Sequence, residues 1–130
     1  MIVYSIVESA AHPNLSALYR QYGFEEIRLT SVRKAIQELK KHQPDLVVAD
    51  FLYGYGNNYA GVNISNLDVF LYSLQKYAPE CQIIALYEKS EQQYIAKLGE
   101  LFSLTGTFAY PVIERDIEVI LAGMAKSARS

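Results

Sequence analysis

Residues 43–50, "QPDLVVAD", decide the fold predicted for this chain. The apolar run Leu46–Ala49 is short and continuous, which is typical of a strand that is buried on both faces of a parallel sheet. The run ends at an acid, Asp50, and a stretch rich in glycine, asparagine and tyrosine follows. We therefore expect a buried strand whose carboxyl end presents Asp50 to a loop.

The same pattern of a strand followed by a helix recurs along the rest of the chain. Apolar runs predict strands at Ile2–Val7, Glu26–Leu29, Leu46–Ala49, Ile83–Tyr87 and Thr107–Tyr110. Apolar residues at helical spacing predict helices over Leu15–Tyr22, Val32–Leu39, Leu67–Leu74 and Ile117–Met124, with a less regular helix over Tyr94–Phe102. Parallel neighbours need crossover connections, so this alternation predicts a doubly wound, five-stranded parallel sheet with helices on both faces.

The composition is that of one ordinary domain. The chain has 130 residues, of which 51% are hydrophobic and 20% charged. Its 12 basic and 14 acidic residues include no basic block, so direct nucleic-acid binding is not expected. Glu8 interrupts the apolar start too early for a signal peptide or a membrane span. We expect a cytoplasmic protein with one domain over residues 1–126 and a polar tail or linker remnant over residues 127–130.

Candidate functional residues gather at the carboxyl ends of the predicted strands. In an open α/β sheet, ligands and chemistry collect beyond these ends. Glu8 follows the first strand, Asp50 the third and Tyr87 the fourth, and the fifth ends at Tyr110 and Pro111. We expect these side chains to share one edge of the sheet.

Over nearly its whole length the chain resembles the receiver domains of bacterial two-component response regulators, the CheY-like domains. "QPDLVVAD" is similar to the third strand of a receiver, with Asp50 at the position of the phospho-accepting aspartate. "APECQIIAL" resembles the approach to the fourth strand, and "GTFAYPV" resembles the end of the fifth, where the family has Lys-Pro. The resemblance implies a flavodoxin-like (βα)5 fold, a three-layer α/β sandwich.

The chain departs from the receiver pattern at the residues that carry the chemistry. A receiver has an acid pair after the first strand for Mg²⁺, a Ser or Thr after the fourth and a lysine after the fifth. Here those positions hold Val7 and Glu8, Tyr87, and Tyr110. A valine offers no oxygen to a metal and a tyrosine offers no positive charge, so we predict a pseudo-receiver with a degenerate pocket and no cofactor. In this interpretation Asp50 caps its own loop.

One alternative is a genuine phospho-accepting receiver that uses Asp50 and Glu8 with Mg²⁺. Another rests on the long connection between Asp50 and Leu67, because connections of more than about 12–15 residues are usually functional or disordered. This connection contains the aromatic residues Phe51, Tyr53, Tyr55 and Tyr59. Their rings could plug the site together with Tyr87 and Tyr110, or could contact a partner. The stretch "GYGNNYAG" could also cradle the phosphate of a small ligand, as in a flavodoxin-like binding protein, although its spacing is not G-x-G-x-x-G.

The sequence therefore predicts a non-catalytic signalling module that acts through a protein partner or as a homodimer. We expect the contact surface on the fourth helix with the last strand and helix, the face that related domains use. His12 and His42 have no Cys, His or acid neighbours at ligand spacing, so we expect surface residues rather than a zinc site.

Overall fold

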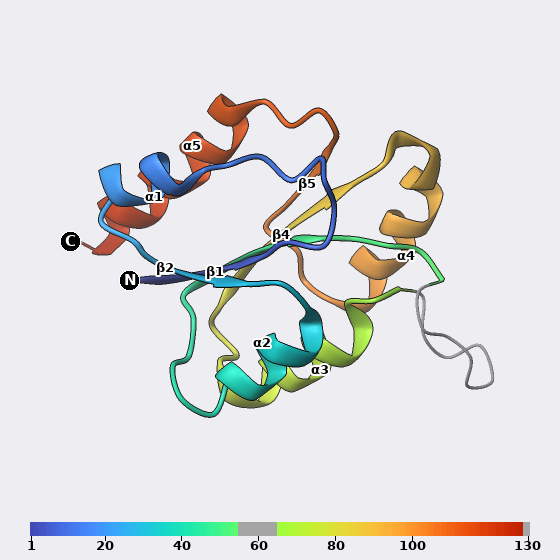
Figure 1. Ribbon diagram of the computed structural model, residues 1–130, viewed down its shortest axis with the longest axis horizontal. Coiled ribbons are helices and arrows are strands. Elements are labelled where there is room, and N and C mark those ends of the chain that lie inside the picture. The colour runs from blue at the N-terminus through green and yellow to red at the C-terminus, as the bar shows by residue number, and fades with distance from the viewer. Residues whose placement is uncertain (55–64, 129–130) are drawn as a thin grey trace.

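Strands and helices alternate through the computed structural model, which describes residues 1–54 and 65–128 (Figure 1). The strands are β1 (Ile2–Ile6), β2 (Glu25–Leu29), β3 (Leu46–Asp50), β4 (Gln82–Tyr87) and β5 (Gly106–Ala109). The helices are α1 (Ser16–Gln21), α2 (Val32–Glu38), α3 (Asp68–Tyr77), α4 (Gln92–Leu101) and α5 (Glu114–Ala128), and a 3₁₀ turn, η1 (Lys89–Glu91), precedes α4. The predicted order of elements is confirmed, and each strand begins and ends within one residue of its predicted bounds.

The sheet is parallel throughout, with strand order β2-β1-β3-β4-β5. β3 lies at its centre, and all five of its residues are buried, as the continuous apolar run predicts. β1 lies between β2 and β3, so the chain winds outward to β2 on one side of β1 and to β3, β4 and β5 on the other. The carboxyl ends of β1 and β3, where the winding changes direction, are therefore the expected place for a site.

Two apolar cores hold the helices on the sheet, one on each face (Figure 1). On one face, side chains of α1 and α5 pack against alternate strand residues such as Val3, Val48 and Leu86. On the other, side chains of α2, α3 and α4 pack against the intervening residues, such as Tyr4, Ala49 and Ala85. Successive side chains of a strand point to opposite faces, so each strand contributes to both cores.

The carboxyl-terminal helix is longer than predicted. α5 continues through Ala128, so residues 127 and 128, which we expected to belong to a polar tail, are helical. Ala125 is buried against the domain, which holds this last part of the helix in place. No helix among the described residues is both long enough and apolar enough to cross a membrane.

Candidate functional site

The carboxylate of Asp50, at the end of β3, has no solvent-accessible surface. Oδ2 accepts hydrogen bonds from the backbone N–H groups of Glu8 (2.8 Å) and Ser9 (2.9 Å), in the loop that follows β1. Oδ1 lies 3.0 Å from Nδ1 of His12 and also accepts a hydrogen bond from the hydroxyl of Tyr110, which follows β5. Each carboxylate oxygen is thus engaged by two donors from the chain itself.

These donors keep Asp50 ionised despite its burial. Burial raises the pKa of the carboxyl group, but the hydrogen bond and the charge of His12 lower it, as do the hydrogen bonds from Tyr110 and from the backbone of Glu8. The pKa of Asp50 is therefore below its ordinary value. Burial, and then the hydrogen bond to Asp50 and its charge, raise the pKa of Tyr110. The pair is a carboxylate that accepts a hydrogen bond from a neutral phenol.

His12 lies in a different environment from the one predicted. We expected a surface residue, but its side chain is only 2% exposed because the loop after β1 folds down onto the edge of the sheet. A carboxylate offers only acceptors, so Nδ1 of His12 is the donor in this contact. Because functional groups collect beyond the carboxyl ends of the strands, a site was expected at the loop after β1. Glu8 was the only residue of this loop predicted to take part in it. The expectation for His42 is confirmed: its side chain is 59% exposed and contacts Glu38 one turn earlier.

Glu8 lies next to Asp50 and is held by Asn66, a residue that no sequence pattern singled out. The side-chain amide of Asn66 donates to Oε1 of Glu8 (2.7 Å) and to the main-chain oxygen of Asp50 (2.9 Å). Its carbonyl oxygen accepts from the backbone N–H of Leu52 (2.8 Å). Burial raises the pKa of Glu8, while the hydrogen bond from Asn66 lowers it, and the pKa remains above its ordinary value. Asn66 therefore joins Glu8 to the end of β3.

Tyr87 does not share the site with Tyr110, and the prediction that both rings fill the space beside Asp50 is wrong for Tyr87. Tyr110 packs in the core under α1 and α5, the face to which Asp50 points. Tyr87 packs in the opposite core with residues of α3 and α4. The reason is the alternation of side chains along β4, which places Tyr87 on the same face as Ala85. Pro111 follows Tyr110 through a cis peptide bond.

The first residues of the tyrosine-rich connection do not cover Asp50. Phe51 is completely buried in the core and cannot contact a partner, contrary to our expectation. The ring of Tyr53 stacks on that of Tyr94 in α4, with centroids 3.5 Å apart, and its backbone N–H donates to Oε1 of Glu91 (3.2 Å). Tyr55, Tyr59 and most of the stretch "GYGNNYAG" lie outside the described residues.

The donors and acceptors around Asp50 fit Mg²⁺ poorly. A hard cation takes several oxygen ligands, but both oxygens of Asp50 already accept hydrogen bonds and Glu8 is held by Asn66. Val7, where a receiver has its first acid, contributes no oxygen. Across residues 1–54 and 65–128, no group of three or more His, Cys, Asp or Glu side chains is placed to hold a metal ion.

Comparison with solved structures identifies the fold. The chain is similar to a response regulator receiver domain protein from Clostridium thermocellum, at 18% identity over 98% of this chain and 95% of that one, with a TM-score of 0.70. The receiver domain of AraT, a response regulator from Geobacillus stearothermophilus, gives 12% identity, 98% and 94% coverage and a TM-score of 0.72. The receiver domain of NtrX from Brucella abortus gives 15% identity over 96% of this chain and 97% of that one, with a TM-score of 0.69.

In sequence, the chain matches no family model and none of the curated proteins. Identities of 12–18% show the fold alone, but the structural match covers the whole domain in both directions. The strand order, the two helical layers and the acid at the end of β3 agree with it. This chain has the flavodoxin-like α/β fold of the CheY-like response regulator receiver domains.

Proposed function

We propose that this chain is a receiver-like signalling module whose acceptor site is closed by its own side chains, and that it acts by contact with another protein rather than by catalysis. One observation carries the proposal: the carboxylate of Asp50 is fully buried, and each of its oxygens is engaged by two donors. The fold supports a role in signalling, and the hydrogen bonds at Asp50 support a degenerate site.

Phosphorylation of an aspartate needs an exposed oxygen lone pair in line with the incoming phosphorus, and cations around the transferring group. At Asp50, His12 and Tyr110 occupy the approach to Oδ1, and the backbone N–H groups of Glu8 and Ser9 occupy Oδ2. Tyr110 is a neutral phenol where a receiver has a lysine. Electrostatic stabilisation is a main source of rate in phosphoryl transfer, so its loss should leave little reaction.

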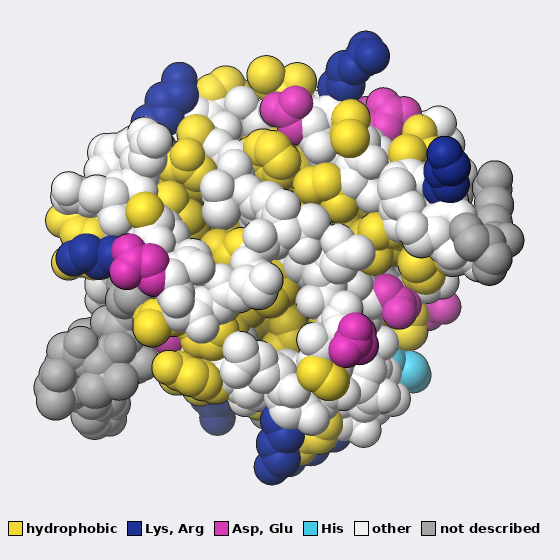
Figure 2. Space-filling model, turned by 180° about the vertical axis from the view of Figure 1, so that it is seen from behind, with side chains coloured by type: hydrophobic (Ala, Val, Ile, Leu, Met, Phe, Trp, Pro, Cys, Tyr) yellow, Lys and Arg dark blue, Asp and Glu magenta, His cyan; other side chains and the backbone are white. Residues whose placement is uncertain are grey.

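Exposed apolar side chains support a contact surface at α4 and α5. Leu101, at the end of α4, is 51% exposed, and Ile113 and Val119, before and within α5, are 64% and 66% exposed. These residues lie on or just before the two helices that flank the edge strand β5 in the chain, and we propose that they belong to one contact surface, which we call the α4–α5 surface. Figure 2 shows groups of hydrophobic side chains on the face turned away from the viewer in Figure 1. Such side chains favour a protein partner or a second copy of this chain.

The test is exposure to a small phosphodonor. The protein is incubated with acetyl phosphate and Mg²⁺, and its intact mass is measured beside that of an ordinary receiver domain treated in the same way. We expect the ordinary domain to gain one phosphate and this protein to remain unmodified. A gain of one phosphate that is lost in Asp50→Asn would contradict the proposal, and would instead support a phospho-accepting receiver that uses Asp50 and Glu8 with Mg²⁺.

A variant that restores the missing lysine sharpens the test. Tyr110→Lys alone should remain unmodified, because Val7 still denies the cation a ligand and His12 still covers Asp50. Phosphorylation of this single variant would show that His12 and the loop after β1 do not close the site.

A further inference from the structure

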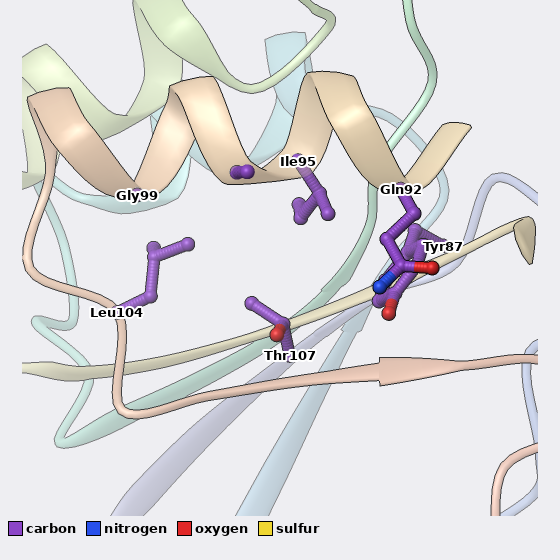
Figure 3. Close-up of a pocket in the computed structure, with 7 residues that line it drawn as sticks. Tyr87, Gln92, Ile95, Gly99, Leu104 and Thr107 are labelled. Atoms are coloured by element: carbon purple, nitrogen blue, oxygen red, sulfur yellow. The ribbon is translucent and has the colours of Figure 1, made fainter.

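The two edge strands of the sheet differ in character. β5 has no charged side chain, and α4 lies over it on the side to which Thr107 points (Figure 3). β2, with the sequence "EEIRL", pairs only with β1 and carries charges of both signs, at Glu25, Glu26 and Arg28. Charged side chains usually protect an edge strand from pairing with another chain. Whether they exclude a second copy of β2 therefore depends on the register in which the two strands meet.

The free backbone groups of β2 belong to Glu26 and Arg28. The backbone N–H of Glu25 donates to the main-chain oxygen of Met1 (2.8 Å), so Glu25 faces β1. In a parallel pair, alternate residues of a strand form the hydrogen bonds to its neighbour. The N–H and C=O groups of Glu26 and Arg28 therefore point away from the sheet, and no residue of the described parts of the chain bonds to them.

The side chains of Glu26 and Arg28 have no charged partner within residues 1–54 and 65–128. One carboxylate oxygen of Glu26 accepts a hydrogen bond from the hydroxyl of Ser16 (2.6 Å), and Arg28 is exposed. Ile27 lies between them and points to the opposite face of the sheet, where it packs against the core. The edge thus presents an acid and a base on one face and an apolar side chain on the other.

A second copy of β2 fits this edge in one antiparallel register. When Ile27 lies opposite Ile27 of the second copy, Glu26 of each copy lies opposite Arg28 of the other. Each of these pairs joins residues whose backbone groups point outward, so each can exchange two hydrogen bonds. A shift of two residues would place Glu26 opposite Glu26, or Arg28 opposite Arg28, and like charges directly opposite each other are destabilising.

We propose that two copies of this chain associate through their β2 edges in this register and form one continuous sheet across a twofold axis. The backbone hydrogen bonds hold the two strands together, and the pairs of Glu26 with Arg28 fix the register. β2 and β5 lie at opposite edges of the sheet, and the α4–α5 surface takes no part in this contact.

Charge reversal tests the register. Glu26→Arg places two pairs of bases opposite each other, and Arg28→Glu places two pairs of acids. Each single variant should weaken self-association at least about tenfold, as measured by sedimentation over a range of protein concentrations. The double variant Glu26→Arg/Arg28→Glu should associate as the wild type does, because opposite charges face each other again.

The two single variants also serve as partners for each other. Mixed in equal amounts, Glu26→Arg and Arg28→Glu should associate, because every facing pair is again a base with an acid. Glu25→Arg is the matched control and should leave self-association unchanged. Glu25 is exposed on the same strand, but it lies opposite Leu29 of the second copy, which carries no charge.

A cysteine pair tests the geometry independently, in a Cys81→Ser background that removes the single native thiol. Ile27→Cys places two thiols in a pair without backbone hydrogen bonds, whose Cα atoms are about 4.5 Å apart. A disulfide needs about 4.4–6.8 Å, so mild oxidation should give a covalent dimer. Glu25→Cys is the control and should not cross-link, because its counterpart lies further along the strand. Val119→Cys reports on the α4–α5 surface in the same way.

Three results would overturn the proposal. The first is a wild type that stays monomeric at high concentration. The second is self-association of the single charge variants as tight as that of the wild type, or a mixture of them that associates no better than either alone. The third is a disulfide in Val119→Cys but none in Ile27→Cys, which would place the contact between copies at the α4–α5 surface.

Discussion

Among single residues, His12 is the least expected contact of Asp50, because its side chain is buried against the carboxylate. Its imidazole lies beside Oδ1 of Asp50, where an exposed carboxylate would instead contact water, a cation or a phosphoryl group. Together with the phenol of Tyr110, it keeps the carboxylate at the end of β3 buried and hydrogen-bonded within the protein. A buried carboxylate that is hydrogen-bonded by the protein contributes to stability, and its loss of a partner should be measurable.

His12→Ala should lower the free energy of unfolding by about 1.5–3 kcal/mol, the usual contribution of a hydrogen bond to a charged group. His42→Ala is the matched control, because that imidazole is 59% exposed and contacts Glu38 at the surface. Its loss should cost less than about 0.5 kcal/mol. Urea unfolding of both variants and the wild type checks the difference. Equal losses in the two variants would contradict the burial of His12.

The lowered pKa of Asp50 predicts a loss of stability in acid. A group whose folded pKa is depressed stabilises the protein above its unfolded pKa, about 3.9 for aspartate, and this contribution disappears as the pH falls through the lower folded pKa. Asp50→Asn removes the titration. The gap in unfolding free energy between wild type and this variant should therefore narrow as the pH falls below about 4.

Urea unfolding from neutral pH down to about pH 3 provides this measurement. The comparison with Asp50→Asn matters because burial raises the pKa of Glu8 in both proteins, which gives a pH dependence of the opposite sign, and the charge of Asp50 raises that pKa further in the wild type only. If the gap remained constant throughout, the hydrogen bonds to Asp50 would not depend on its charge.

Among the elements, the start of α4 is tied to the exit of β3. Tyr53 stacks on Tyr94, and the backbone N–H of Tyr53 donates to Glu91, the last residue of η1. The burial of Phe51, and the hydrogen bonds of Asn66 to Leu52 and to the main chain of Asp50, hold residues 51–52 against the end of β3. The segment that follows β3 and the start of α4 are therefore in direct contact.

A double-mutant cycle with Tyr53→Ala and Tyr94→Ala should give a coupling energy of about 0.5–1.5 kcal/mol, the usual value for a stacked aromatic pair. A cycle with Tyr77→Ala and Tyr94→Ala is the control and should give none, since Tyr77 lies at the end of α3 and its ring contacts Lys76. Thermal or urea unfolding of the single and double variants measures both. Additive effects of the Tyr53 and Tyr94 substitutions would show that the stack does not hold α4.

For the whole molecule, the proposed non-catalytic role requires contact through the surface. We predict a homodimer or a complex with a partner through the α4–α5 surface. Val119→Glu should disrupt either one, because a charge would be buried at the contact. Val69→Glu, on the exposed side of α3, is the matched control and should leave association unchanged. Both positions are more than half exposed, so the fold should tolerate each change within about 0.5 kcal/mol.

Sedimentation at increasing protein concentration measures self-association of the wild type and both variants. A partner captured by the wild type and by Val69→Glu, but lost with Val119→Glu, would locate a contact with a different protein. A wild type that stays monomeric at high concentration and captures no partner would contradict the predicted surface. Equal loss of association in both variants would place the contact elsewhere.

The sequence by itself determined the order of the elements and the parallel sheet. Apolar spacing within each segment is a local property, and short continuous runs such as Leu46–Ala49 are stable as strands only when both faces are covered. The position of Asp50 at the carboxyl edge follows from this order, as does that of Tyr110. The resemblance to receivers used the same residues, and the structural comparison agrees with it.

Only the tertiary structure decided which side chains meet Asp50 and which do not. His12 and Asn66 lie 38 and 16 residues from it along the chain, and they reach it because the loop after β1 and the residues just before α3 both lie at this edge of the sheet. Tyr87 is directed to the opposite core by the alternation along β4, although its strand ends at the same edge. Contacts between loops depend on backbone hydrogen bonds and burial across the whole domain, and local spacing carries no information about them.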